Sequence, residues 1–246
     1  MTIADTLPVK LSALGVDEKR TLVQRLFTRI APRYDWFNRI ASCGLDQWWR
    51  KIVLTRGGIQ PRQRILDVCT GTGDLAILCA KRQHGQGVVI GVDMNSDMLS
   101  LARRKQRSQD LAVDWLQGDA EALPFASGSF DRVVIGFSTR NLSDLTNGLR
   151  EMVRVLKPQG RLILLETGFP SHPVVRFGYQ AFLFTFARGI GWLLTGKLWP
   201  FTYLARSVRE FLTPQQVVER LRSVQTTVEY VPLSCGLASL YLATKR

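Results

Sequence analysis

The segment from residue 64 to residue 76 (RILDVCTGTGDLA) constrains the fold of this chain more than any other. Its first half is apolar, as in a buried strand, and the pattern after its second glycine is helical. Gly71 and Gly73 lie between the two, where a tight strand-to-helix turn often requires positive φ and lets the backbone approach a ligand closely. The spacing Gly-x-Gly-x-x-Ala, with Asp93 about 20 residues further on, also fits the dinucleotide-binding fingerprint. The turn therefore predicts a small-molecule site at the end of a strand.

Two carboxylates indicate which ligand this turn favours. Asp74 lies where a pyrophosphate would rest on the helix N-terminus, and a carboxylate there would repel the phosphate and compete for the same amides. A cofactor with a cationic amine and a cationic sulfonium would instead be favoured by Asp67 and Asp74. The acidic residues therefore argue against NAD and indicate S-adenosylmethionine.

Chain length and cysteine usage limit the class of protein. At 246 residues the chain can bury one sizeable core, with little left for a second domain. No cysteines have C-x-x-C spacing and the histidines show no ligand spacing, so we expect free thiols in a reduced compartment and no metal. The cysteines are Cys43, Cys69, Cys79 and Cys235, and the histidines are His84 and His172.

The net charge of +13 implies an anionic partner, either nucleic acid or the anionic surface of a membrane. A basic composition unrelated to any partner is the alternative. Residues 1–11 lack the long apolar run of a secretory signal, and the most apolar stretch, 174–199, is interrupted by Arg176, Arg188 and Lys197. We therefore expect a cytoplasmic protein without a transmembrane span, associated peripherally with the inner face of the membrane.

The order of elements predicts an α/β fold with a doubly wound, mostly parallel sheet of seven strands, Rossmann-like in arrangement. Residues 1–18 are predicted to be a flexible tail and 19–246 a single domain. Within that domain, 19–60 form an N-terminal helical cap and 172–208 an insertion on the substrate side, before the last helix. Strands are expected near 64–68, 88–92, 113–116, 131–137, 161–165, 228–231 and 237–243, and helices near 19–30, 47–54, 97–107, 145–156 and 213–221, with a stop signal at 157–160.

Several segments carry a resemblance to a known family. DVCTGTGD from residue 67, GVD from 91 and GDAEALPF from 118 resemble class I S-adenosylmethionine-dependent methyltransferases. A finer set is similar to the C-methyltransferases of menaquinone and ubiquinone biosynthesis, over about residue 27 to residue 246. That set comprises FTRIAPRYD from residue 27, Trp49-Arg50, Arg140-Asn141, RVLKP from 154 and YLARSV from 203.

The resemblance implies where the cofactor binds. The glycine turn would let the backbone approach the amino-acid part, and Asp67 and Asp74 would favour its ammonium. Asp93, at the end of the second strand, would accept hydrogen bonds from the ribose hydroxyls, and Asp119 would bind the adenine amino group. The implied cofactor-binding residues are Asp67, Gly71, Thr72, Gly73, Asp74, Asp93, Met94, Asp119 and Ala120.

The implied reaction is C-methylation of an electron-rich ring, in which ionising a hydroquinol hydroxyl makes the ortho carbon nucleophilic. Arg140 and Asn141 follow the fourth strand, where the methyl acceptor would lie. Arg140 is no base, because its pKa is above about 12, but its charge could lower the phenol pKa or position a water that takes the proton. Asn141 could donate to a quinol oxygen. The alternatives are that Arg140 pairs with an acidic neighbour and that Asn141 caps the next helix.

Tyr34 is the third residue to which the resemblance implies a catalytic role. In the related family the segment that holds Tyr34, Asp35 and Asn38 folds over the cofactor as a lid. The alternative for these residues is ordinary loop packing.

The predicted reaction is methylation of a polyprenylated naphthoquinol, from demethylmenaquinol to menaquinol. A ubiquinone-precursor benzoquinol, a phytyl-naphthoquinol or another small molecule is the alternative, because the histidine that many relatives carry near their end is absent here. Nucleic acid is not expected as a partner, since the motifs of amino-group and cytosine methylation are missing. The oligomeric state stays open, a homodimer included.

The insertion at 172–208 combines aromatic and basic residues, which suits a lipophilic acceptor at an anionic membrane surface. Its aromatic side chains are expected to surround a prenyl tail, and cations here and near residue 27 to face lipid headgroups; simple core packing is the alternative. The aromatic residues are Phe177, Tyr179, Phe182, Phe184, Phe186 and Trp192, and the cations are Arg25, Arg29, Arg176, Arg188 and Lys197.

Overall fold

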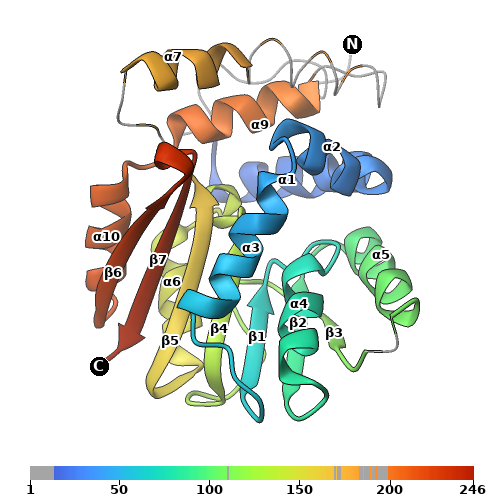
Figure 1. Cartoon of the computed structure of the whole chain (residues 1–246), viewed down its shortest axis with the longest axis vertical. Coiled ribbons are helices and arrows are strands. Elements are labelled where there is room, and N and C mark those ends of the chain that lie inside the picture. Colours follow the sequence, from blue (N-terminus) through green and yellow to red (C-terminus); the bar gives the residue numbers. More distant parts are fainter. Residues whose placement is uncertain are drawn as a thin grey trace.

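The computed structural model describes residues 14–109, 111–168, 170, 173–182, 185, 189, 192 and 199–246 (Figure 1). Its centre is a seven-stranded sheet in the order β3-β2-β1-β4-β5-β7-β6, in which β7 runs opposite in direction to the other six strands. This topology confirms the predicted fold. The strands are β1 (Arg64–Val68), β2 (Val88–Asp93), β3 (Asp114–Gln117), β4 (Phe130–Gly136), β5 (Leu156–Thr167), β6 (Thr226–Leu233) and β7 (Ala238–Lys245).

The strand order places the site. β1 pairs with β2 on one side and with β4 on the other, so the order of strands reverses next to β1. Crossover connections leave in opposite directions at such a point, which opens a crevice beyond the carboxyl ends of the strands. The glycine turn follows β1 directly and Arg140 follows β4, so the topology brings both segments to this crevice.

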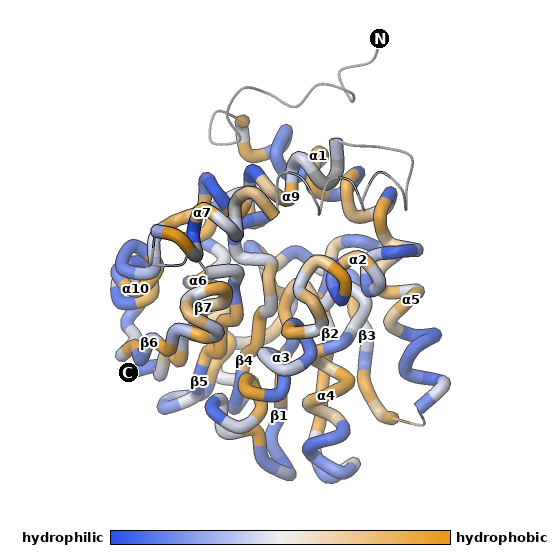
Figure 2. Tube along the Cα trace, turned by 45° about the horizontal axis from the view of Figure 1, so that its top comes forward, coloured by the Kyte–Doolittle hydropathy of each residue, from blue (hydrophilic) through white to orange (hydrophobic). Residues whose placement is uncertain are grey.

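Helices cover both faces of the sheet. One buried apolar cluster unites one face with α3 and α4, and a second unites the other face with α6 and α10. Figure 2 shows hydrophobic stretches along the central strands, whereas the end of α5 is hydrophilic. The bounds are α3 (Leu45–Arg56), α4 (Asp74–Gln83), α5 (Ser96–Arg107), α6 (Leu145–Arg154) and α10 (Pro214–Arg222).

A third group of helices lies beyond the carboxyl ends of the parallel strands (Figure 1). It has an apolar cluster of its own, in which Leu26 and Ile30 of α1 pack with Phe37 of α2, Met98 of α5 and Tyr203 of α9. These helices are therefore a layer over the crevice rather than part of the sheet core. They are α1 (Val16–Ile30), the short 3-10 helix η3 (Ala31–Arg33), α2 (Tyr34–Ala41), α7 (Pro173–Phe182) and α9 (Trp199–Glu210).

The structure places the limits of the predicted tail, helical cap and insertion somewhat differently. Helix α1 begins at Val16, inside the predicted tail, because the Glu18 carboxylate accepts a hydrogen bond from the Gly15 amide (3.1 Å) and so caps its first turn. Residues 1–13 lie outside the described part. Within the predicted cap of residues 19–60, α3 packs on the sheet instead. The predicted insertion contains α7 and α9, and α9 continues two residues beyond Val208, the predicted end of the insertion.

The predicted stop after residue 156 is a bulge within a strand. Helix α6 ends at Arg154, and β5 begins at Leu156, earlier than expected. The pairing with β4 passes from Phe130↔Leu156 to Arg132↔Arg161, so the Pro-Gly segment between these pairs loops out. Gln159 has φ +59°, which explains why the sequence there resembles a turn. No helix among the described residues has both the length and the apolar character that a membrane span needs.

Gly73 is required by packing, which gives a first prediction. A Cβ at this position would lie 2.4 Å from Trp115 Cη2, and φ is +81°. We expect Gly73→Ala to lower the free energy of unfolding by about 2–4 kcal/mol, the sum of steric overlap and left-handed strain. Gly85→Ala is the matched control, since φ is +73° there but nothing lies within 4 Å, and it should cost about 1 kcal/mol. Equal losses of unfolding free energy for both variants in urea denaturation would show that the Trp115 side chain moves aside at no measurable cost.

Candidate active site

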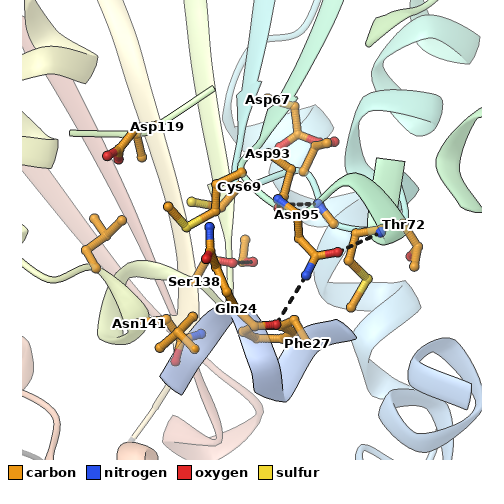
Figure 3. Close-up of a pocket in the computed structure, with 18 of the residues that line it drawn as sticks. Gln24, Phe27, Asp67, Cys69, Thr72, Asp93, Asn95, Asp119, Ser138 and Asn141 are labelled. Carbon is orange, nitrogen blue, oxygen red and sulfur yellow. Dashed lines mark hydrogen bonds between the residues drawn. The ribbon is translucent and has the colours of Figure 1, made fainter. Parts of the chain in front are cut away.

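A strand-end cavity lies between α1 and the carboxyl ends of β1, β2, β3 and β4 (Figure 3). All the predicted cofactor residues except Gly73 line it, and Gln24 and Phe27 of α1 close it from the opposite side. Gly73 packs against Trp115 instead, so its role is to shape the turn. The predicted residues that line the cavity are Asp67, Gly71, Thr72, Asp74, Asp93, Met94, Asp119 and Ala120.

Asp93 is held rigidly at the end of β2. Its Oδ2 accepts a hydrogen bond from the Gly71 amide (2.8 Å), and its Oδ1 accepts one from the Asn95 amide (2.8 Å). Burial raises the pKa of this carboxyl, while the two amides act in the opposite direction. Each carboxylate oxygen has a second lone pair, so Asp93 can also accept two donors from a ligand in the cavity.

Asp119 and Asp74 line the cavity but already have partners. Asp119 Oδ2 forms an ion pair with Arg20 of α1 (2.8 Å). Asp74 Oδ1 lies 2.6 Å from Lys105 Nζ, and its Oδ2 lies 3.9 Å from Arg50. Although burial acts to raise the pKa of Asp74, these two cations hold it below its usual value. The Asp74 carboxylate therefore already pairs with Lys105 and Arg50, and a ligand ammonium would share it with these two cations.

A second, helix-lined cavity of about 370 Å³ lies beside the first. Its wall is mostly apolar and comes from α2, α3, α7 and α9 together with the end of β4. Tyr34 and Arg50 line both cavities, so the two meet at these side chains. The residues that define the helix-lined cavity are Tyr34, Phe37, Asn38, Ala41, Trp49, Arg50, Phe137, Arg140, Tyr179, Phe182, Leu204 and Val208.

Arg140 lines the helix-lined cavity as one half of a buried ion pair. Its Nη1 lies 2.5 Å from Oε1 of Glu166, and the two side chains are 7% and 1% exposed. Nη1 also donates to the Phe137 carbonyl (2.6 Å), and Nε donates to Ser207 Oγ (3.3 Å). Although burial acts to lower it, Glu166 raises the pKa of Arg140 above its usual value, so Arg140 is a permanent cation. Of the alternatives for Arg140, pairing with an acidic residue is the one the structure contains.

Asn141 lies in the wall of the strand-end cavity and does not cap the next helix. Asp144 caps α6, because its side chain accepts from the Asn147 amide (3.0 Å). Asn141 Oδ1 accepts from the Tyr203 hydroxyl (3.3 Å), and its buried Nδ2 has no hydrogen-bond partner among the described residues. An unsatisfied buried donor is costly, so this amide is poised to bind a ligand acceptor.

Two of the aromatic residues expected around a prenyl tail point away from the cavity. Tyr179 and Phe182 line it, whereas Phe177 is 75% exposed and Trp192 is 54% exposed. The helical period explains the difference for α7, because Phe177 is two residues from Tyr179 and therefore on the opposite face. The predictions for Phe184, Phe186, Arg188 and Lys197 concern residues outside the described part.

The comparisons with known proteins agree with this arrangement. The sequence model of the ubiE/COQ5 methyltransferase family matches residues 14–245. The chain belongs to this family. It is 38% identical to a demethylmenaquinone methyltransferase of Deinococcus radiodurans, over 93% of this chain and 95% of that protein. It is 35% identical to the ubiquinone/menaquinone biosynthesis C-methyltransferase UbiE of Geotalea daltonii, over 93% and 98%.

Solved structures show the same fold at lower identity. A SAM-dependent methyltransferase from Aquifex aeolicus superposes with a TM-score of 0.63 at 19% identity, covering 82% of this chain and 92% of that one. The [4+2]-cyclase SpnF superposes with a TM-score of 0.61 at 18% identity, over 81% and 80%. Membership in the family makes this protein an S-adenosylmethionine-dependent methyltransferase.

The strand-end cavity of this ubiE/COQ5 family member fits S-adenosylmethionine. Asp93 offers two fixed acceptors for a pair of vicinal hydroxyls, and Asn141 Nδ2 is an orphan donor. Gly71, with φ +56° and nothing within 4 Å of a Cβ built there, leaves the backbone open to a ligand. No group of three or more His, Cys, Asp or Glu side chains in the described part of the chain is arranged to hold a metal ion.

Asp67 gives the site a pH dependence. Burial raises the pKa of its carboxyl to about 7, although the Thr70 hydroxyl (2.6 Å) and the Ala76 amide (3.0 Å) bind the ionised form. Between the unfolded value of 3.8 and 7, the native state therefore holds a proton that the unfolded state has lost. The contribution of Asp67 to stability thus falls as the pH rises through this window.

Binding of a cationic ligand beside Asp67 is expected to release this proton. The affinity for S-adenosylhomocysteine, which carries the same ammonium as the donor, should therefore rise between about pH 6 and pH 8. Calorimetry in buffers of different ionisation enthalpy measures the proton directly, and Asp67→Asn should abolish its release. A release that survives in Asp67→Asn would assign the proton to Asp93, whose pKa burial also raises.

Sequence reasoning missed three residues of this site. Glu166, the partner of Arg140, lies 26 residues away on β5 and has no local motif. Asn95 donates to Thr28 Oγ1 (2.8 Å) and so connects the turn after β2 to α1. Arg50 was noticed only as part of a Trp-Arg pair; its guanidinium lies 5.3 Å above the Phe137 ring, a residue with φ +57°. Its position between the cavities depends on the packing of α3, which no spacing reveals.

Proposed function

We propose that this protein transfers a methyl group from S-adenosylmethionine to a ring carbon of a polyprenylated naphthoquinol, converting demethylmenaquinol to menaquinol. The observation that carries the proposal is the apolar helix-lined cavity, which meets the strand-end cavity at Tyr34 and Arg50 and holds Arg140 in its wall. A flat ring with an apolar tail fits such a wall. The names of the relatives from Deinococcus radiodurans and Thermus thermophilus support the naphthoquinol; the latter is 39% identical over 89% of this chain and 100% of that protein.

The residues around the junction of the cavities supply orientation and charge. When bound, S-adenosylmethionine supplies an electrophilic methyl group on its sulfonium. The hydrogen bonds of Arg140 to described residues use Nε and Nη1, and we assign Nη2 to a ring oxygen. Positive charge near this oxygen favours the quinolate, and the ionised oxygen in turn raises electron density at the ortho carbon, while a water beside the guanidinium takes the hydroxyl proton. The new carbon–carbon bond forms as the sulfur–methyl bond breaks, and the ring carbon then loses its hydrogen as a proton.

Tyr34 acts as a hydrogen-bond donor in this proposal. Burial raises the pKa of its hydroxyl, although Asn38 and the nearby arginines oppose this, so the phenol stays protonated and is no base. Its ring packs edge-on against Phe27 of α1, with centroids 5.7 Å apart. Because Tyr34 lines both cavities, we assign its hydroxyl to the second ring oxygen. Alignment and exclusion of water then account for much of the rate.

A methyl-transfer assay tests the function. Labelled S-adenosylmethionine is offered with a short-tailed demethylmenaquinol reduced in situ, and in parallel with the corresponding benzoquinol and with total RNA. Label on the naphthoquinol supports the proposal. Label on the benzoquinol alone keeps the family and changes the acceptor, and label on RNA alone contradicts the quinol and makes the charge of +13 the central clue.

We further propose that the protein works in the cytoplasm, at an anionic membrane surface from which the acceptor reaches the helix-lined cavity. The helices that line this cavity carry exposed apolar side chains on their outer faces, with Trp36 69% and Phe177 75% exposed. Arg33 and Arg39 on either side of Trp36 are exposed, as are Arg25 and Arg29 of α1. Exposed aromatic residues next to cations suit an interface with anionic headgroups.

Vesicle binding tests this surface. Phe177→Ser should weaken co-sedimentation with phosphatidylglycerol vesicles about tenfold, because one large apolar side chain no longer enters the lipid. Added salt should weaken binding further, since the cations are screened. Leu116→Ser, on β3 and away from these helices, removes a 39% exposed side chain and should leave binding unchanged. Equal binding by wild type and Phe177→Ser would exclude α7 from the contact.

A further inference from the structure

Four side chains from four separate elements meet at the start of α2. Nζ of Lys105, on α5, lies 2.6 Å from Asp35 Oδ2 and 2.6 Å from Asp74 Oδ1. Thr72, in the glycine turn, donates from its hydroxyl to Asp35 Oδ1 (2.6 Å), and Lys105 Nζ donates to the same hydroxyl (3.2 Å). Both oxygens of Asp35 are therefore bound, one by the turn and one by α5.

The charges in this cluster interact more strongly than those of an ordinary surface ion pair. The side chains of Lys105, Asp35 and Asp74 are 24%, 35% and 23% exposed, so solvent screens their charges only in part. Lys105 lies between the two carboxylates and so offsets the repulsion between Asp35 and Asp74, while Arg50, 3.9 Å from Asp74 Oδ2, is a second cation beside Asp74.

The cluster also connects the two cavities. Thr72 and Asp74 line the strand-end cavity, whereas Phe37 and Asn38, on the same helix as Asp35, line the helix-lined cavity. A ligand that orders the glycine turn also orders Thr72 and Asp74, the side chains to which Asp35 and Lys105 connect α2. By linkage, fastening α2 must favour that ligand by the same factor.

We propose that Lys105 is a positioning residue that fastens α2 to the glycine turn, so that binding of the methyl donor fixes the wall of the acceptor cavity. Lys105 acts through Asp35, Thr72 and Asp74 and lines neither cavity itself. The identity of the acceptor rests on the proposed function, but the fastening of α2 does not.

Limited proteolysis reads the position of α2 without any acceptor. Arg33 lies just before α2 and Arg39 lies within it. Both side chains are exposed, yet trypsin cleaves there only when the helix opens. With S-adenosylhomocysteine bound, cleavage after these residues should be about tenfold faster in Lys105→Met than in wild type, the effect of losing a charge-assisted contact. Lys105→Arg should restore protection. Arg104→Met, which removes an exposed cation from the same helix, is the matched control and should cleave like wild type.

Two further measurements complete the test. The affinity for S-adenosylhomocysteine should fall several-fold in Lys105→Met, and Asp35→Asn should add little to this loss in the double variant, because both changes break one contact. In the methyl-transfer assay, KM for the quinol should rise at saturating donor. Cleavage of Lys105→Met at the rate of Arg104→Met would overturn the proposal. If Lys105→Met fails to fold, the cleavage rate of Asp35→Asn tests the proposal in its place. An absence of quinol methylation with faster cleavage would contradict the proposed function only.

Discussion

Arg140→Met is expected to slow methyl transfer strongly and to destabilise the protein. The change leaves Glu166 without its cationic partner at a side chain only 1% exposed. Breaking a buried ion pair in this way costs about 3 kcal/mol, the lower end of the usual range, because Thr139 and Thr167 still donate to the carboxylate. Loss of the charge near the quinolate oxygen should lower kcat by about 100- to 1000-fold. Urea denaturation and the labelled-methyl assay measure the two effects.

The double variant Arg140→Met/Glu166→Gln separates stability from chemistry. A neutral amide at position 166 needs no cation, so most of the lost stability should return. Activity should not return, because the cation is still missing. Recovery of methyl transfer along with stability would mean that Arg140 supports the fold alone and that the charge for the quinolate comes from elsewhere. Arg50 would then be the candidate, because it also lines the helix-lined cavity.

Asp93→Asn is expected to lower the affinity for S-adenosylhomocysteine by about 100-fold, the value of two hydrogen bonds to a charged acceptor. The structural reason lies behind the carboxylate. Each oxygen accepts a backbone amide, from Gly71 and from Asn95, at 2.8 Å. A carboxamide can accept only one of these and turns an N–H toward the other, so the glycine turn loses an anchor as well.

Asp114→Asn is the matched control for this prediction. Asp114 lies on β3, the neighbour of β2, and its side chain is exposed. It should therefore bind S-adenosylhomocysteine as wild type does, measured by calorimetry under the same conditions. Wild-type affinity in Asp93→Asn would remove Asp93 from the cofactor site.

The strands of the sheet could be predicted from the sequence because each strand has a local apolar pattern. The apolar runs, the glycine turn and Asp93 lie within about one βαβ unit of one another, the range over which sequence patterns determine structure. The bulge around Gln159 was misread for the same reason, since its local pattern is that of a turn and only pairing with β4 makes it part of a strand.

The polar contacts that connect the helical layer to the site could not be predicted. Lys105 and Asp35 are 70 positions apart, and Arg140 and Glu166 are 26 apart, so neither pair has a local signature. Such pairs depend on how α2, α5 and β5 pack, which tertiary structure alone determines. The position of Asn141 was likewise open: its neighbours suited a helix cap, but Asp144 takes that role.

The division of labour between the two cavities bears on how enzymes of this architecture diversify. The strand-end cavity is built mainly from turns that follow β1, β2, β3 and β4 and is closed by α1, whereas the helix-lined cavity is built mainly from side chains of α2, α3, α7 and α9. Among the residues that the structure describes, only Tyr34 and Arg50 line both cavities. Substitutions in α7 can therefore remodel the helix-lined cavity while the strand-end cavity remains intact. One scaffold can in this way adapt to new methyl acceptors by small steps.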